Sequence, residues 1–219
     1  MSVMTIERRV LDKNDTIAAG NRDRFACHGV LAVNIVSSPG AGKTTLLESM
    51  IEHLRGRVRI AVVEGDVQTD IDAQRVARYG VPVVQIVTNG GCHLDAALVG
   101  EAIDNFDLSA IDLLLIENVG NLVCPANFDL GEDMKIVVLS TTEGADKPLK
   151  YPAMFRRASA LVINKMDLLP YVNVSIDDLT AHAVHINPFL EIFETAATTG
   201  AGVPELCEWL EEEMARPRA

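Results

Sequence analysis

The fold is decided by the stretch Val30-Leu31-Ala32-Val33-Asn34-Ile35-Val36-Ser37-Ser38-Pro39-Gly40-Ala41-Gly42-Lys43-Thr44-Thr45. Its first half is apolar and β-branched, which predicts a buried strand. The apolar residues that follow the stretch recur at helical spacing; they are Leu46, Leu47, Met50, Ile51 and Leu54. A glycine-rich turn between a strand and a helix, ending in Gly-Lys-Thr, predicts a phosphate-binding loop.

The residues of this loop indicate its chemistry. Backbone N–H groups and the start of the helix form a pocket for a polyphosphate. We expect Lys43 to reach the β- and γ-phosphate oxygens and to act in catalysis, and the Thr44 hydroxyl to bind Mg²⁺. The usual pattern begins with glycine, and Ser37 stands at that position here. The nucleotide contacts expected from the loop are Pro39, Gly40, Ala41, Gly42, Lys43, Thr44 and Thr45.

Composition limits the classes of protein to consider. The chain has 219 residues, 48% of them apolar, so we expect one domain over residues 1–219. Residues 1–26 are predicted to form a helical extension on a core of residues 27–219. No apolar stretch is long enough for a membrane span and no signal-like segment begins the chain, so we expect a cytoplasmic protein. The net charge of −12 and the lack of a basic run argue against a nucleic-acid partner.

Apolar runs alternate with helical patterns along the chain. Strands are predicted near residues 30–36, 58–64, 82–87, 111–117, 134–140, 159–164 and 189–193. Helices are predicted near residues 44–55, 70–79, 94–105, 149–157, 176–185 and 203–214. This alternation predicts an α/β fold of three layers with a mostly parallel, doubly wound sheet, whose ligands bind beyond the carboxyl ends of the strands.

The tetrapeptide Asn164-Lys165-Met166-Asp167 directly follows a predicted strand. A carboxylate at Asp167 can accept both the N1–H and the 2-amino group of guanine, whereas adenine would leave it unpaired. The spacing therefore predicts GTP or GDP as the ligand in preference to ATP. We expect Asn164 to tie the base loop to the phosphate loop, the Lys165 stem to cover the ring, and the Ala197 N–H to reach the guanine O6.

Acidic residues end two other predicted strands. Glu117-Asn118-Val119-Gly120 is a variant of the D-x-x-G switch, in which the Gly120 N–H bonds a γ-phosphate oxygen. Glu117 is expected to hold Mg²⁺ through water, and Asp66 to orient the attacking water or to share the Mg²⁺ shell. Asp70 and Asp72 are weaker candidates for that shell. Because no glutamine follows Gly120 closely, we expect slow intrinsic hydrolysis by the catalytic set Lys43, Asp66, Glu117 and Gly120.

Cys92, His93 and Cys124 follow two strands that end at the same sheet edge, so the three donors can meet. Thiolate and imidazole suit Zn²⁺ and Ni²⁺. From the residues alone, two buried cysteines and a capping histidine are an alternative. Cys27 and Cys207 have apolar, helical surroundings and are interpreted as core residues.

Together these motifs resemble the HypB family, GTPases that assist nickel insertion during [NiFe]-hydrogenase maturation. The most specific pieces are Gly91-Cys92-His93-Leu94-Asp95 and Glu117-Asn118-Val119-Gly120-Asn121-Leu122-Val123-Cys124-Pro125, with support from residues 64–69 and 143–152. The resemblance spans residues 30 to 212 approximately. It implies a SIMIBI-type P-loop NTPase that uses GTP and Mg²⁺, and a Ni²⁺ or Zn²⁺ site at Cys92, His93 and Cys124.

The resemblance also implies partners: a GTP-dependent homodimer, other hydrogenase-maturation proteins and the hydrogenase large-subunit precursor. The cysteine-rich motif and the histidine-rich tract that some members carry at the N-terminus are absent from this sequence. Two other functions stay open at this point. One is a nucleotide-switch chaperone that gates a partner metalloenzyme without carrying metal, and the other is a P-loop kinase, against which Asp167 argues. A urease-accessory GTPase would carry Cys-Pro-His, but Ala126 follows Cys124-Pro125.

Overall fold

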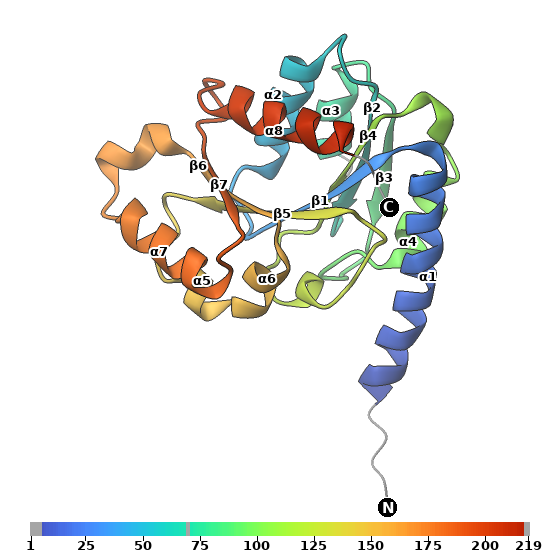
Figure 1. Cartoon of the computed structure of the whole chain (residues 1–219), viewed down its shortest axis with the longest axis horizontal. Coiled ribbons are helices and arrows are strands. Elements are labelled where there is room, and N and C mark those ends of the chain that lie inside the picture. The colour runs from blue at the N-terminus through green and yellow to red at the C-terminus, as the bar shows by residue number, and fades with distance from the viewer. Residues whose placement is uncertain (1–5, 69–70, 217–219) are drawn as a thin grey trace, which may run out of the picture.

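The computed structural model describes residues 6–68 and 71–216. Strands and helices alternate along this part of the chain (Figure 1). The strands are β1 (Leu31–Ser37), β2 (Ile60–Asp66), β3 (Val83–Val87), β4 (Leu113–Glu117), β5 (Met134–Ser140), β6 (Ala160–Asn164) and β7 (Glu191–Glu194). The α-helices are α1 (Ile6–His28), α2 (Lys43–Leu54), α3 (Ile71–Ala77), α4 (Ala96–Ile103), α5 (Lys147–Lys150), α6 (Pro152–Arg157), α7 (Ile176–Ile186) and α8 (Val203–Ala215). Short 3₁₀ helices η1 (Leu108–Ala110), η2 (Cys124–Ala126) and η3 (Met166–Tyr171) complete the set.

The strands form one sheet in the order β3-β2-β4-β1-β5-β6-β7, with every neighbouring pair parallel. The predicted α/β class is therefore confirmed, and the sheet is entirely parallel where a mostly parallel one was predicted. The chain leaves β1 toward β2 and β3, returns to insert β4 beside β1, and then continues on the other side. This reversal beside β1 is where a doubly wound sheet opens a crevice at its carboxyl edge.

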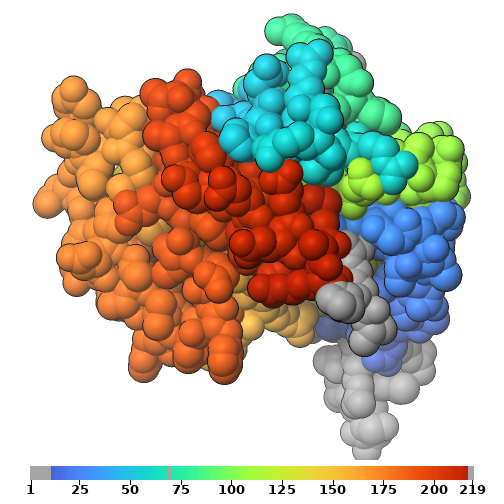
Figure 2. Space-filling model, turned by 45° about the horizontal axis from the view of Figure 1, so that its top comes forward, coloured from blue at the N-terminus to red at the C-terminus, as the bar shows by residue number. Residues whose placement is uncertain are grey.

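Alternate residues of each strand pack into opposite faces of the sheet. In β4, Leu113 and Leu115 lie in the core under α2, α3 and α8, whereas Leu114 and Ile116 lie in the core under α1 and α4. At the other end of the sheet, α6 and α7 cover a third cluster around Phe155. Helix α8 lies beside α2 on the first face (Figures 1 and 2). Because both faces are covered, the strands are apolar throughout, as is usual for parallel sheets.

Two buried asparagines of α1, Asn14 and Asn21, hydrogen-bond this helix to the start of α4 and to the segment before β5. Asn21 Nδ2 donates to Ala96 O at 2.8 Å and to Leu130 O at 3.0 Å. Asn14 donates to Asp129 O and accepts from Ala96 N, at the start of α4. These bonds compensate polar groups that α1 and its partners bury, so the helix is held in one register.

Two expectations need adjustment. The helix predicted near 149–157 is two helices, α5 and α6, because a proline occupies the first turn of each and Tyr151 between them leaves the helical region. Asp70 lies outside the described residues. Over the described ranges, no helix is long and apolar enough to cross a membrane.

Candidate functional site

The phosphate-binding loop connects β1 to α2. Gly40 and Gly42 have φ of 76° and 96°, a left-handed conformation that side chains other than glycine rarely adopt. A Cβ on Gly42 would lie 2.6 Å from Asn164 Nδ2, so the base loop and the phosphate loop touch at this point. The turn needs glycine for both reasons.

Ser37 takes part in the loop in place of the usual glycine. The Lys43 ammonium donates to Ser37 Oγ at 2.9 Å and lies 3.9 Å from Glu117 Oε1. Lys43 is buried, and these two partners stabilise its charge. Lys147 reaches the same loop from α5 and donates to Ser38 Oγ at 3.1 Å.

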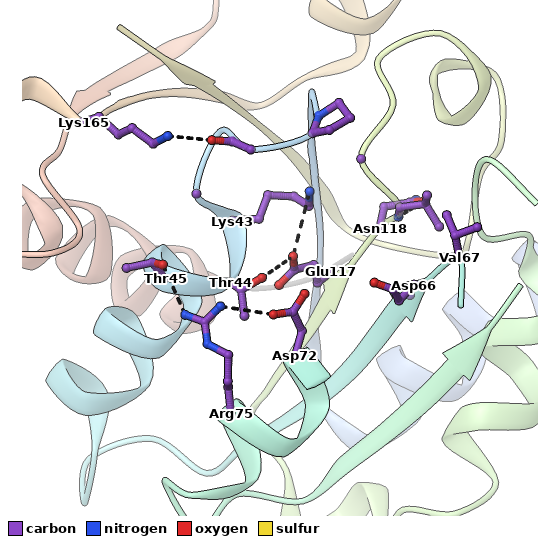
Figure 3. Close-up of a pocket in the computed structure, with 16 residues that line it drawn as sticks. Lys43, Thr44, Thr45, Asp66, Val67, Asp72, Arg75, Glu117, Asn118 and Lys165 are labelled. Carbon is purple, nitrogen blue, oxygen red and sulfur yellow. Dashed lines mark hydrogen bonds and ion pairs between the residues drawn. The ribbon is translucent and has the colours of Figure 1, made fainter. Parts of the chain in front are cut away.

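A cavity of about 530 Å³ opens over this loop and over the ends of β2 and β4. Thr44 Oγ1 donates to Glu117 Oε1 at 2.9 Å, and Figure 3 shows Lys43, Thr44 and Glu117 directed at one another. Asp66 lines the cavity at the end of β2, and its Oδ1 accepts from Gln68 N. The predicted residues Lys43, Thr44, Asp66, Glu117 and Gly120 therefore line one cavity.

Glu64 forms a buried carboxyl pair with Glu117, which is its register partner on the neighbouring strand. Burial, and next the charge of Glu117, raise the pKa of Glu64 to about 10, so Glu64 holds a proton at neutral pH. Burial also raises the pKa of Glu117, against the opposing effects of Lys43 and the Thr44 hydrogen bond. Among the described residues, Glu64 Oε1 and Glu117 Oε2 are buried without a hydrogen-bond partner. The unpartnered Oε2 of Glu117, whose other oxygen accepts from Thr44, fits a hard divalent cation such as Mg²⁺.

Helix α3 contributes a part of the cavity wall for which the sequence predicted only Asp72, as a weaker candidate, and not Arg75. Asp72 and Arg75 line it from α3, one helical turn apart, and Arg75 donates to Asp72 at 3.1 Å (Figure 3). Arg75 also pairs with Glu48 at 2.6 Å and donates to Thr45 Oγ1 at 3.3 Å, both on α2. Arg75 thus fixes α3 against the phosphate-loop helix. The i, i+3 spacing of Asp72 and Arg75 on a predicted helix was the available signal.

The base loop borders a second cavity of about 310 Å³, lined by Asn164, Lys165, Asp167 and Ala197. Asn164 Nδ2 donates to Ala41 O at 3.0 Å and Lys165 Nζ donates to Gly40 O at 2.6 Å, so both residues bridge to the phosphate loop. The Ala197 N–H donates to Asn164 Oδ1 at 3.1 Å. This donor, expected to meet a guanine oxygen, is therefore already engaged in the structure.

Gly120 lies against the phosphate loop. A Cβ at this position would lie 3.1 Å from Pro39 Cα. The segment that follows Gly120 reaches Cys124 within one short loop, and Asn121 Oδ1 accepts from Val123 N and Cys124 N there. The loop that borders the nucleotide cavity is therefore the loop that carries Cys124.

The donor atoms of Cys92, His93 and Cys124 all lie within 4.8 Å of one another. The Cys92 Sγ to His93 Nδ1 distance is 3.4 Å. Burial lowers the pKa of His93, so its imidazole is in the neutral form that binds metals. The hydrogen bond between Cys92 and Cys124, and next burial, raise the pKa of the Cys92 thiol. A bound divalent cation would favour the thiolate and so offset this rise. The donor set fits a soft or borderline cation such as Ni²⁺ or Zn²⁺.

The other two cysteines differ from each other. Cys207 is fully buried in the core, and burial raises its pKa to about 12. The interpretation of Cys27 as a core residue was wrong, because it is exposed. Helix α1 buries Ala18, Asn21 and Phe25, which share one face, and Cys27 lies two residues after Phe25, on the opposite face.

Comparisons with known proteins agree with this arrangement. The model of the CobW/HypB/UreG nucleotide-binding domain matches residues 31–194. The hydrogenase maturation factor HypB of Escherichia coli (strain K12) is 50% identical over 209 residues, which cover 95% of this chain and 72% of that protein. The probable hydrogenase maturation factor HypB of Methanocaldococcus jannaschii is 41% identical over 98% of this chain and 97% of its own length.

Solved structures give the same result. The crystal structure of HypB from Helicobacter pylori in complex with nickel superposes with a TM-score of 0.88 at 39% identity, covering 92% of this chain and 95% of that chain. The signal recognition particle receptor FtsY from Elizabethkingia anophelis, at 14% identity and a TM-score of 0.55, shares the fold alone. Because the family model spans most of the sequence and these relatives match nearly all of it, the chain belongs to the HypB family of hydrogenase maturation factors.

Proposed function

We propose that the chain is a GTP-hydrolysing metallochaperone that binds Ni²⁺ or Zn²⁺ and assists nickel insertion into a [NiFe]-hydrogenase precursor. One observation carries this proposal: Cys92, His93 and Cys124 converge within 4.8 Å, and Cys124 belongs to the loop that also presents Gly120 to the nucleotide cavity. A protein that only gated a partner enzyme would not need three such donors together.

The base loop supports the choice of GTP. Asp167 lines the cavity that adjoins the phosphate loop, and its carboxylate can accept two protons from guanine but none from the N1 of adenine. Lys165 lies next to this cavity and donates to Gly40 O, which holds its side chain across the phosphate loop. The preference of Asp167 for guanine over adenine also argues against an ATP-dependent kinase.

The residues that line the cavity over the phosphate-binding loop would each have a separate role in GTP hydrolysis. Lys43 would leave Ser37 and Glu117 for the phosphate oxygens, and the Gly120 N–H would bond the γ-phosphate. Thr44, Glu117 and Asp66 would hold Mg²⁺, which neutralises phosphate charge when bound. Asp66 would also orient the attacking water. Since no glutamine assists it, turnover should be slow.

GTP-dependent dimerisation fits the surface beside the cavity. Three apolar side chains are exposed there: Val67 lines the cavity, Ile71 begins α3, and Val123 directly precedes Cys124. A second copy would cover these side chains and could add ligands to the three donors of the metal site. Other hydrogenase-maturation proteins and the hydrogenase large-subunit precursor would then exchange metal with this dimer. The thiol donors require a reducing compartment, which favours the cytoplasm.

The test is a Ni²⁺ titration of the GDP-bound wild type, Cys92→Ala and Cys207→Ala. Cys207 is the control, because it packs in the core beneath α2 and α8 and is not one of the three metal donors. We expect Cys92→Ala to lose at least ~10-fold in nickel affinity and Cys207→Ala to match the wild type. Equal affinity in all three proteins would reject the metallochaperone and leave the gating chaperone as the better description.

A further inference from the structure

Lys135 is a buried lysine inside β5 that neither lines the cavity over the phosphate loop nor belongs to the three metal donors. It is 5% exposed. A buried ammonium is unfavourable unless its protons find partners. The Lys135 Nζ lies 3.3 Å from Glu132 Oε1 and donates to Pro125 O at 3.1 Å and to Phe128 O at 3.4 Å. One carboxylate and two loop carbonyls therefore match its three protons.

Both carbonyls belong to the loop that carries a metal donor. Pro125 directly follows Cys124 in η2. Phe128 places its ring against His93, with ring centroids 4.0 Å apart and an interplanar angle of 46°. Lys135 thus bonds the loop at two points. One is the carbonyl of Pro125, next to Cys124, and the other is the carbonyl of Phe128, whose ring packs on His93.

The Lys135–Glu132 pair continues as a chain of buried side chains. Glu132 Oε1 accepts from Asn34 Nδ2 at 3.1 Å, and Asn34 Oδ1 accepts from Asn118 Nδ2 at 3.2 Å. Asn118 Oδ1 then accepts from Leu94 N at 3.1 Å and from Val119 N at 3.0 Å. Leu94 is the residue after His93.

The four side chains of Lys135, Glu132, Asn34 and Asn118 form a hydrogen-bond relay, and their chemistry fixes which group donates in each bond. Lys135 can only donate and the Glu132 carboxylate can only accept, so Asn34 must present its amide N–H to Glu132. Asn118 must present its oxygen to two backbone N–H groups, which leaves its N–H for Asn34. The relay of Lys135, Glu132, Asn34 and Asn118 therefore links the Cys124 loop to the Cys92–His93 loop with one consistent set of bonds.

We propose that Lys135 is a positioning residue for the metal site: through this relay it fixes the Cys124 loop relative to the Cys92–His93 loop, so that the three donors stay within reach of one ion. The inference rests on the metal site of the proposed function. Residues that orient metal ligands from behind typically change metal affinity by ~10–100-fold when replaced. A pair that merely stabilised the fold would instead change stability and leave the nickel affinity of the folded protein unaltered.

The test compares Lys135→Met/Glu132→Gln with the wild type. The double variant removes both charges together, so no unpaired charge remains buried. Glu132 accepts from Asn34 Nδ2 and from Leu130 N, and the single amide oxygen of glutamine keeps one of these two bonds. Asp133→Ala is the matched control, because Asp133 lies in the same turn but accepts from Ala32 N on β1. Nickel affinity is measured by chelator competition with GDP bound, at one pH, along with the Ni²⁺–thiolate absorption and the melting temperature.

We expect the double variant to bind Ni²⁺ ~10–100-fold more weakly with an altered thiolate absorption, and to bind GDP as the wild type does. Asp133→Ala should keep the wild-type nickel affinity. Asn34→Ser cuts the relay at β1, where Asn34 accepts from Asn118 of the loop that leads to Cys124, and it should also weaken nickel binding beyond the control. This second variant decides the question if the double variant fails to fold.

Wild-type nickel affinity in the folded relay variants would overturn the inference. If Cys92→Ala loses nickel while the relay variants retain it, the inference alone fails and the proposed function stands. If Cys92→Ala retains nickel as well, the metal site is absent and both fail.

Discussion

At the scale of single residues, Asp167 and Ser37 illustrate different kinds of inference. The role proposed for Asp167 follows from its chemistry and its place after a strand, and Asp167 lines a cavity beside the phosphate loop. Ser37 departs from the usual glycine, and no pattern predicted that its hydroxyl accepts from Lys43. Residue types and spacing indicated the metal donors. The partners behind them, such as Lys135, depend on tertiary contacts that spacing does not encode.

Asp167→Asn should reverse the base preference. An amide cannot accept from both guanine donors, but it can donate to the C2 carbonyl of xanthine, so binding should shift from GDP to the xanthine nucleotide. The wild type should bind GDP at least ~100-fold more tightly than ADP. Competition binding measures both values, and Asp177→Asn, an exposed acid on α7, is the control. Comparable wild-type affinity for ADP would reject Asp167 as the base reader.

Lys43→Ala and Asp66→Ala should separate binding from turnover. Lys43→Ala removes the charge that faces the phosphates and should abolish hydrolysis. Asp66→Ala should retain GTP binding, because Thr44 and Glu117 still hold Mg²⁺, and should slow single-turnover hydrolysis by ~10-fold or more, because the attacking water loses its orienting group. Asp72→Ala, measured in parallel, tests the other pocket acid. Wild-type turnover in Asp66→Ala would remove Asp66 from the catalytic set.

At the scale of elements, apolar runs predicted the strands well because both faces of the sheet are covered. The helices were harder to bound. Two prolines split the segment 147–157 into α5 and α6, and helical spacing alone did not place the break at Tyr151. Cys27 was wrongly assigned to the buried face of α1, because a largely polar helix with few apolar residues gives no clear orientation. The polar anchors Asn14 and Asn21 define the buried face better.

Asn21→Ala should loosen α1. The change leaves Ala96 O and Leu130 O without their donor, and each is held at 3.0 Å or less by Asn21 Nδ2. A buried carbonyl that loses its partner typically costs about 1–3 kcal/mol in the free energy of unfolding. Urea unfolding measures the loss, with Asp23→Ala on the exposed face of α1 as the control. A variant as stable as Asp23→Ala would show that these bonds do not hold the helix.

At the scale of the whole molecule, the parallel sheet brings all candidate sites to one edge. Strands β1, β2, β4 and β6 end at the phosphate loop, Asp66, Glu117 and Asn164, and the loops after β3 and β4 carry the metal donors. The alternation of strands and helices predicted this shared edge. It did not predict that Gly120 would lie close to Pro39, a contact that places the loop leading to Cys124 against the phosphate loop.

The most direct measurement of the central claim is the nickel affinity of the wild type in two nucleotide states. Closing the switch loop on a γ-phosphate must move Cys124, because Gly120 and Cys124 lie in one loop. Nickel affinity with a non-hydrolysable GTP analogue should therefore differ from that with GDP by ~5–150-fold, and GTP-analogue affinity should change by the same factor when nickel is bound. Both are measured at one pH with the dimer fraction recorded. Equal nickel affinities in the two states would contradict a nucleotide-controlled metal site.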